Sequence, residues 1–457
     1  TGIHVDYRES SPFNQGQDFD LMIASGDYVD IFPASSNLSP DQAFEQDICI
    51  DLTGYMDTYL RNYHAILKSN DEYMHTAVND EGQILSVNSM YDENVAVNSG
   101  LVIRKDWLDQ LGLDMPETYD DYHKVLTTFK NQLGANAAMH MGSSGVLTGN
   151  YFCSGFGING YVSMMDAPFY QVDGEVKFGP IQPEFKDYLT MMNQWYSEGL
   201  MAKDFYAIVD DMGSASEPAV LNGNVGMWYH MADKIGTYNK SASVEGFHAV
   251  GLADAVQREG DISHFYQNEG SSKTTNKGIS ISVQAEDPEN ILRFFDWFFT
   301  KEGSTVANYG IEGTSFEYDA EGNPQYTDLI ANNPDYTFQQ IALLYCWADI
   351  PTIVDRDRSF QATYTQDSLD AIELYGKNTD GAYEMPTRLS FTAAESDEYA
   401  STIGDIETRA DEQIVRFVIG ELNFDSDWDD FVQELKDMGL ERCVELKQDA
   451  LDRYDQR

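Results

Sequence analysis

The stretch over 95–130, VAVNSGLVIRKDWLDQLGLDMPETYDDYHKVLTTFK, limits the possible folds more than any other part of the chain. Its first part predicts a strand, because apolar Val97, Leu101 and Ile103 enclose a small, polar run at 98–100. A strand with such a midpoint is typical of a segment that crosses between two lobes, since core strands carry larger apolar side chains.

Two helices are predicted after this strand. The first is expected to end at Gly112, in the left-handed conformation common after helices, and Pro116 prevents its continuation. The second is expected to begin after Thr118, whose hydroxyl can accept a first-turn N–H while Asp121 occupies the reciprocal capping position. Its apolar residues recur every three or four positions and predict one buried face: Tyr119, Tyr122, Val125, Leu126 and Phe129.

The N-terminal part of the chain predicts an α/β protein. Ile3, Val5 and Tyr7 alternate like a strand, a helical segment ends near Ser25, and the apolar run at 29–32 predicts a buried strand. This rhythm predicts mostly parallel sheets flanked by helices, which bind ligands beyond the carboxyl ends of their strands. Because 457 residues exceed the size at which one core keeps growing, two lobes are expected.

The net charge of −49, from 77 acidic and 28 basic residues, indicates the solvated acidic surface of a secreted protein. A cationic ligand, such as a polyamine or a metal ion, is the functional alternative. Nucleic acid is excluded as a partner, because a polyanion would be repelled and no Lys/Arg stripe is present. The cysteines lie far apart, without zinc-ligand spacing, and are expected to be separate buried thiols: Cys49, Cys153, Cys346 and Cys443.

Four segments, in this order along the chain, carry a resemblance to a known family. They are ASGDYVDIF at 24–32, IRKDWLDQLGLDMPETYDDYHKVLTTFK at 103–130, DPENILRFFDWFFTKEGSTVANYGIEGT at 287–314 and DWDDFVQELKDMGLERCVELKQDALDRY at 427–454. Together they resemble the extracellular solute-binding proteins of bacterial ABC importers, in the carbohydrate-binding branch found as lipoproteins.

The resemblance implies a two-lobed, periplasmic-binding-protein-like fold of the α/β class, with a hinge of several crossing segments. In the family a strand and a helix normally precede the segment that the N-terminus matches, and on this resemblance both are expected to be missing from the sequence. The implied first lobe is 1–98 plus 279–345, the second lobe is 103–275 plus 350–457, and the crossings are at 97–103, 277–280 and 345–351.

The resemblance also implies a function: the lobes close on a carbohydrate, an oligosaccharide, and deliver it to the membrane permease subunits of an ABC importer. The protein is then a monomer without a cofactor, anchored at the cell surface as a lipoprotein whose signal peptide and anchor cysteine are absent from this chain. A glycoside hydrolase or lyase is the alternative from another class. The expectation is no enzyme, because the G-x-S-x-G, H-E-x-x-H and P-loop motifs are missing.

Aromatic and polar residues beside predicted strand ends are the candidate ligand-binding groups. Sugar rings stack on aromatic faces, and sugar hydroxyls pair with the acidic and amide side chains that converge in a cleft between lobes. For each residue, an ordinary core or surface position is the alternative. The candidates are Asp27, Tyr91, Asp92, Asn98, Trp228, Tyr229, His230, Tyr266, Glu269 and Trp347.

A bound metal ion is not expected. Relatives place a cation loop after the helix that matches 118–130, but the corresponding run at 131–141 contains no carboxylate. The acidic residues at 425–429 have the first ligand spacings of an EF-hand, yet Asp430 and Lys436 stand where that loop needs Gly and Glu. A charged helix start is therefore predicted there.

Overall fold

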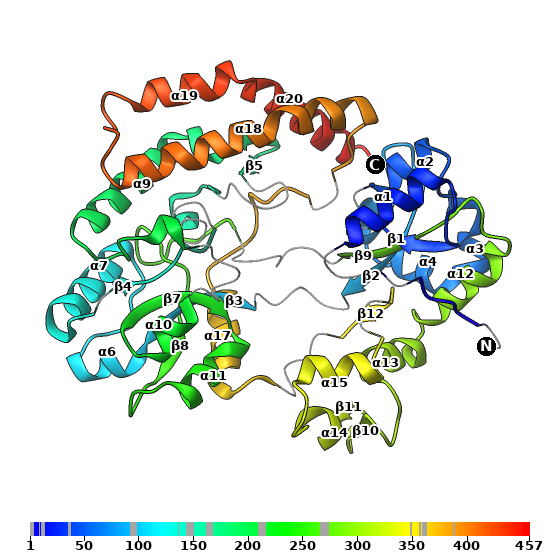
Figure 1. The fold of residues 1–457 in the computed structure, drawn as a ribbon, viewed down its shortest axis with the longest axis horizontal. Coiled ribbons are helices and arrows are strands. Elements are labelled where there is room, and N and C mark those ends of the chain that lie inside the picture. Colours follow the sequence, from blue (N-terminus) through cyan, green and yellow to red (C-terminus); the bar gives the residue numbers. More distant parts are fainter. Residues whose placement is uncertain are drawn as a thin grey trace.

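A computed structural model describes residues 4–8, 10, 14–34, 38–91, 98–135, 137–142, 150–160, 168–208, 216–265, 274–347, 350–355, 358, 363–386 and 389–457. It has two lobes, each built around a sheet (Figure 1). The first-lobe sheet has the order β1-β9-β2-β12, formed by Ile31–Pro33, Thr274–Ile281, Val87–Tyr91 and Ile353–Val354. The second-lobe sheet has the order β4-β7-β3-β8, formed by Ala137–Met139, Val225–Met231, Ser99–Arg104 and Ala249–Gly251.

Helices surround both sheets, as expected for an α/β protein. Around the first sheet lie α1 (Gln15–Ser25), α2 (Pro40–Glu45), α3 (Met56–Tyr59), α4 (Arg61–Leu67), α5 (Asp71–Ala77), α12 (Pro288–Trp297), α13 (Lys301–Tyr309), the hairpin β10 (Phe316–Tyr318) and β11 (Pro324–Tyr326), α14 (Asp328–Ala331) and α15 (Phe338–Tyr345). Around the second lie α6 (Lys105–Leu111), α7 (Tyr119–Thr128), α8 (Asn150–Cys153), the hairpin β5 (Phe169–Val172) and β6 (Glu175–Phe178), α9 (Pro183–Ser197), α10 (Glu217–Leu221), α11 (Asp233–Ser241), α17 (Gln366–Tyr375), α18 (Ala393–Val418), α19 (Trp428–Asp437) and α20 (Leu440–Tyr454).

In each sheet, one internal strand runs opposite to its described neighbours. β9 is antiparallel to both β1 and β2, and β12 is parallel to β2. β3 is antiparallel to both β7 and β8, and β4 is parallel to β7. Three strands of each sheet thus share a direction. Mostly parallel sheets were expected, but most of the strand pairings are antiparallel, because the strand that runs the other way lies inside each sheet.

The strand pairings shift two of the expected crossings. The segment 277–280 lies within β9 and pairs with first-lobe strands, so the chain reaches the first lobe before Thr274. β12 pairs with β2, so the chain is still in the first lobe at Val354, beyond the expected crossing at 345–351. The alternation of side chains could not reveal these shifts, because it indicates that a segment is a strand but not which strand it pairs with.

The helix pair after β3 is confirmed. α6 ends at Leu111, and Gly112 follows with φ of 63° while its N–H bonds the carbonyls of Leu108 and Asp109. Thr118 and Asp121 form the predicted capping box at the start of α7. The hairpin β5–β6 turns at residues 173 and 174, both with positive φ. The expected N-terminal strand is not formed by residues 4–8.

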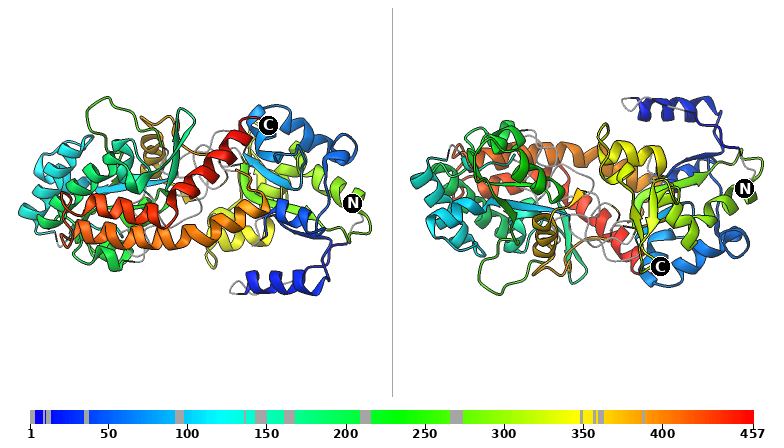
Figure 2. Two further views of the ribbon diagram at one scale, coloured as in Figure 1. Left: turned by 90° about the horizontal axis from the view of Figure 1, so that it is seen from above. Right: turned by 90° about the horizontal axis from the view of Figure 1, so that it is seen from below.

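The C-terminal helix α20 bridges the lobes. Figure 2 shows its end beside the first lobe in both views. There the Arg453 Nε donates to Asp80 Oδ2 at 2.7 Å, and the Arg457 Nη2 donates to Asp80 Oδ1 at 2.8 Å. Asp80 lies between α5 and β2, whereas α20 packs on α18 and β6. We call Asp80, Arg453 and Arg457 the α20 clasp.

All four cysteines are free and buried, as predicted. Burial raises the pKa of the Cys49 and Cys153 thiols to about 12, which keeps them protonated and unreactive. No helix within the described ranges is both long and apolar enough to cross a bilayer.

Candidate ligand-binding site

In each sheet, the three strands that share a direction have their carboxyl ends on the hinge side. Ser99, at the amino end of β3, pairs with Met231, at the carboxyl end of β7. In the first lobe, Thr274, at the amino end of β9, pairs with Met90, near the carboxyl end of β2. Because the neighbours of β3 and β9 run opposite to them, their carboxyl ends lie on the hinge side, where open α/β sheets bind ligands.

A group of polar side chains lies at the carboxyl ends of β4 and β7, and we call it the strand-end cluster: His140, Ser216, Glu217, His230 and Lys234. His140, after β4, shares a hydrogen bond of 2.9 Å between its Nδ1 and the Oγ of Ser216. Glu217, the first residue of α10, holds its Oε1 at 3.6 Å from His230 Nε2 and at 3.7 Å from Lys234 Nζ. The cluster therefore combines donors and acceptors, as hydroxyl-rich ligands require.

His230 is the most deeply buried histidine of this cluster, with 3% of its surface exposed. Its Nδ1 accepts a hydrogen bond of 2.7 Å from the Met231 N–H, which leaves the proton of the neutral ring on Nε2. Nε2 has no hydrogen-bond partner among the described residues. Burial lowers the pKa of His230 to about 4, against the opposing effect of Glu217. His230 is therefore a neutral ring with an N–H to donate.

Trp228, expected at the ligand, lies in the core of the second lobe with none of its surface exposed. Its ring packs on Tyr238 at 5.5 Å and on Phe247 at 6.4 Å. Tyr229 points to the opposite face of β7 and donates a 2.7 Å hydrogen bond to the Oγ of Ser99. Trp228 is thus a packing residue, and Tyr229 holds the start of β3.

The other predicted residues lie in different parts of the molecule. Tyr91 ends β2 and its carbonyl accepts from Tyr73, and Asn98 precedes β3 with its carbonyl bonded to Ala232, so both lie on the hinge side. Asp27 lies before the amino end of β1, on the side away from the hinge, and pairs with Arg8. Trp347 lies beside Phe298 in the first lobe, with 44% of its surface exposed. The remaining candidates lie outside the described residues: Asp92, Tyr266 and Glu269.

Trp347 stacks on Phe298 with ring centroids 5.6 Å apart, beyond the end of α15. Nothing in these contacts joins it to the strand-end cluster. The contact removes one face of the indole from any ligand and leaves Trp347 as part of the first lobe's surface.

Sequence reasoning missed Ser216, Glu217 and Lys234. Ser216 is 1% exposed and donates to the His140 carbonyl at 3.1 Å, so it joins the end of β4 to the start of α10. The only available signal was position, because these residues flank the strand Val225–Met231 on both sides. Because the chain contains so many acidic residues, nothing in the sequence distinguished Glu217 from the others.

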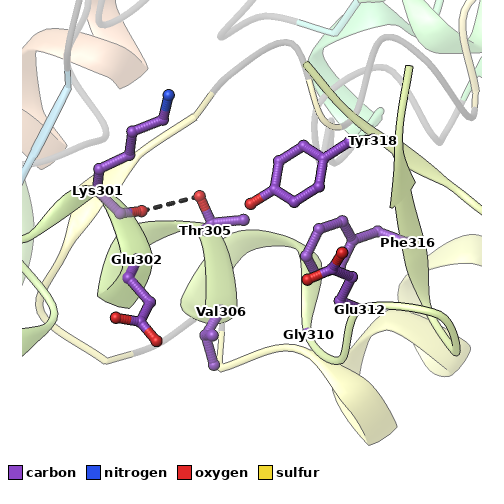
Figure 3. Close-up of a pocket in the computed structure, with 8 residues that line it drawn as sticks. All are labelled: Lys301, Glu302, Thr305, Val306, Gly310, Glu312, Phe316 and Tyr318. Atoms are coloured by element: carbon purple, nitrogen blue, oxygen red, sulfur yellow. Dashed lines mark hydrogen bonds between the residues drawn. The ribbon is translucent and has the colours of Figure 1, made fainter. Parts of the chain in front are cut away.

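A hollow of about 380 Å³ lies in the first lobe, between α13 and β10 (Figure 3). Glu302, Glu312 and Tyr318 stand around it, and Thr305 Oγ1 is bonded to the Lys301 carbonyl. None of its lining residues follows a strand of the two four-stranded sheets, so we do not place the ligand there.

Acid is expected to destabilise the protein through His230. The unfolded chain binds this proton near pH 6.5, whereas the folded chain binds it only near pH 4, so stabilisation present above pH 6.5 is lost as the pH falls towards 4. His230→Gln should remove roughly 2 kcal/mol of the pH dependence of the unfolding free energy between pH 7 and 4.5.

Urea unfolding at several pH values measures this difference. His4→Gln is the matched control, because the His4 side chain is 87% exposed, and it should leave the pH dependence unchanged. The assignment fails if wild type and His230→Gln lose stability in parallel as the pH falls.

Comparison with known proteins identifies the family. Residues 1–305 match the profile of the bacterial extracellular solute-binding proteins. The chain is 24% identical to the fructooligosaccharide ABC transporter substrate-binding protein FusA of Streptococcus pneumoniae, over 99% of this chain and 85% of FusA. It is 24% identical to the lipoprotein LipO of Bacillus subtilis, over 96% and 84% of the two chains.

Solved structures agree with the two-lobed fold. The alginate-binding protein AlgQ2 matches with a TM-score of 0.73 and 25% identity, over 95% of this chain and 88% of AlgQ2. An HMO-binding, ABC-transporter-associated solute-binding protein of Bifidobacterium longum infantis matches with a TM-score of 0.77 and 17% identity, over 98% of this chain and 92% of that protein. With a profile match over most of its length, the chain belongs to the bacterial extracellular solute-binding protein family.

Proposed function

We propose that this solute-binding protein captures an oligosaccharide between its lobes and delivers it to the permease of an ABC importer. The observation that carries the proposal is the convergence of strand carboxyl ends from both lobes on one side, with the strand-end cluster beside them. His230 supplies a neutral donor and Glu217 an acceptor, which suits hydroxyl groups. The saccharides named for FusA and AlgQ2 support this ligand class.

Hinge closure is the proposed mechanism. The proposed lobes start from the expected boundaries, 1–98 plus 279–345 and 103–275 plus 350–457, with two changes. β9 from Thr274 onwards and β12 up to Val354 belong to the first lobe, because both pair with first-lobe strands. Closure would bring Tyr91 of the first lobe towards His230 of the second, beside Asn98 at the crossing, and the ligand would stabilise the closed state by contacting both lobes.

We further propose that the protein acts as a monomer, anchored outside the cell as a lipoprotein like LipO. Catalysis on oligosaccharides is set aside, because the family consists of solute-binding proteins. A polyamine or cation receptor has only the net charge of −49 in its favour.

A thermal-shift screen tests the proposal, with neutral and acidic oligosaccharides and polyamines as ligands. A bound oligosaccharide should raise the unfolding temperature, because a ligand at 100 times its Kd adds about 2.7 kcal/mol to the stability of the folded state. Polyamines should have no effect. A shift by a polyamine alone would replace the proposed function with the cation receptor.

A further inference from the structure

A second pocket, of about 640 Å³, lies in the second lobe. This volume is within the roughly 300–1,000 Å³ typical of small-molecule sites. Its walls come from the segment around Phe156, from the hairpin β5–β6, from the start of α9, from 257–264 and from Tyr383. None of these residues belongs to the strand-end cluster. We call it the aromatic pocket.

Its aromatic wall is held in place by local contacts. Tyr383 and Tyr170 stack at 6.4 Å with an angle of 25°, and the rings of Tyr383 and His264 lie 4.2 Å apart. The Tyr383 N–H donates to the His264 carbonyl at 3.1 Å, and the Gln171 N–H donates to the Tyr383 carbonyl at 2.9 Å. The His264 ring is fixed in turn by Asp380 at 3.0 Å. The wall is therefore organised before any ligand arrives.

The rim of the pocket is polar and mixed. Lys177 lies 3.4 Å from Glu175, so a nearby carboxylate already balances its charge. Gln182, Glu184 and Asp261 supply amide and carboxylate groups around the opening, and both acids lie on exposed positions. Such a rim can pair with neutral hydroxyls, whereas the acids repel a uronate or a phosphate.

The pocket is joined to the hinge side of the lobe by the chain itself. The segment 252–257 leaves the carboxyl end of β8, and Leu252 donates its N–H to the Leu101 carbonyl of β3. The pocket residues 257–264 follow at once, before the chain returns to the first lobe in β9. The aromatic pocket and the strand-end cluster therefore lie in the same lobe.

We propose that the aromatic pocket is a distal subsite for a neutral sugar unit of a longer oligosaccharide. This proposal rests on the proposed function and adds to it a preference for chain length and for uncharged units. The surface of the Tyr383–His264 pair that lines the pocket would contact the C–H face of the sugar, and Gln182 with Glu184 would bind its hydroxyls.

Calorimetry with a series of neutral oligosaccharides of increasing length, from the class selected by the screen, tests the subsite. Wild type should bind longer members more tightly. Tyr383→Ala should weaken the binding of long members about tenfold and change short ones less than about twofold. Tyr383→Phe, which keeps the ring, should retain most of the long-chain affinity.

Two further variants keep the test decisive. Glu184→Gln changes an exposed side chain to one of nearly the same shape, and it should weaken the binding of long members several-fold. Tyr206→Ala, at a tyrosine of the same lobe that is 52% exposed and outside the pocket, should change nothing.

The outcomes separate the two proposals. If short sugars bind and the length preference survives both Tyr383→Ala and Glu184→Gln, the subsite is overturned while the proposed function stands. The subsite is likewise overturned, and the proposed function stands, if wild type binds longer oligosaccharides no more tightly than short ones. If no oligosaccharide binds wild type, both proposals fall.

Discussion

Replacing Trp228 with alanine is expected to lower the free energy of unfolding by about 4 kcal/mol. The side chain has no exposed surface, it packs on Tyr238 and Phe247, and its residue pairs with Val102 across β7 and β3. Removing the indole leaves a cavity, and the surrounding core can collapse into it only in part. The variant therefore loses the free energy gained by burying the indole and also the contacts that the indole made.

Urea unfolding measures the Trp228→Ala effect, and Trp347→Ala is its control because Trp347 is 44% exposed. The control should cost about 1 kcal/mol or less. Unchanged stability of Trp228→Ala together with weaker sugar binding would return Trp228 to the ligand site and contradict its placement in the core.

Replacing Asp80 with alanine is expected to cost about 3 kcal/mol, because it leaves two arginines without their shared partner. The Arg457 side chain is only 2% exposed and Asp80 is 13% exposed, so water screens this network weakly. Arg453 keeps a bond of 2.7 Å to Glu395, and Arg457 keeps one of 3.0 Å to the His75 carbonyl. These remaining hydrogen bonds keep the loss of stability smaller than it would be for a buried charge without any partner.

Thermal and urea unfolding measure the effect of Asp80→Ala. Glu81→Ala is the matched control, since Glu81 is the neighbouring acid on an exposed position, and it should stay within about 0.5 kcal/mol of wild type. Equal stability of the two variants would show that the α20 clasp does not stabilise the contact between the lobes.

Local structure was predictable where one short segment decides it. The end of α6 at Gly112, the capping box of Thr118 and the turn of β5–β6 each depend on residues within a few positions, and each is confirmed. The two-lobed α/β fold followed from chain length and from segments that resemble a family, and the structures of relatives agree with it.

Strand pairing and side-chain orientation were not predictable in the same way. β7 is buried on both faces from Val225 to His230, so alternation could not tell that Trp228 faces a core. The α20 clasp joins Asp80 to residues more than 370 positions away, and no local pattern marks such a pair. His230 was identified from its place at a strand end, whereas Glu217 depended on the packing of α10 beside β7.

Small-angle X-ray scattering, with and without a saturating oligosaccharide from the screen, tests the central claim most directly. Closure of two lobes on a ligand predicts a smaller radius of gyration in the bound state, with the sugar recovered intact. An unchanged radius of gyration at full occupancy, or release of shortened sugars, would contradict the account.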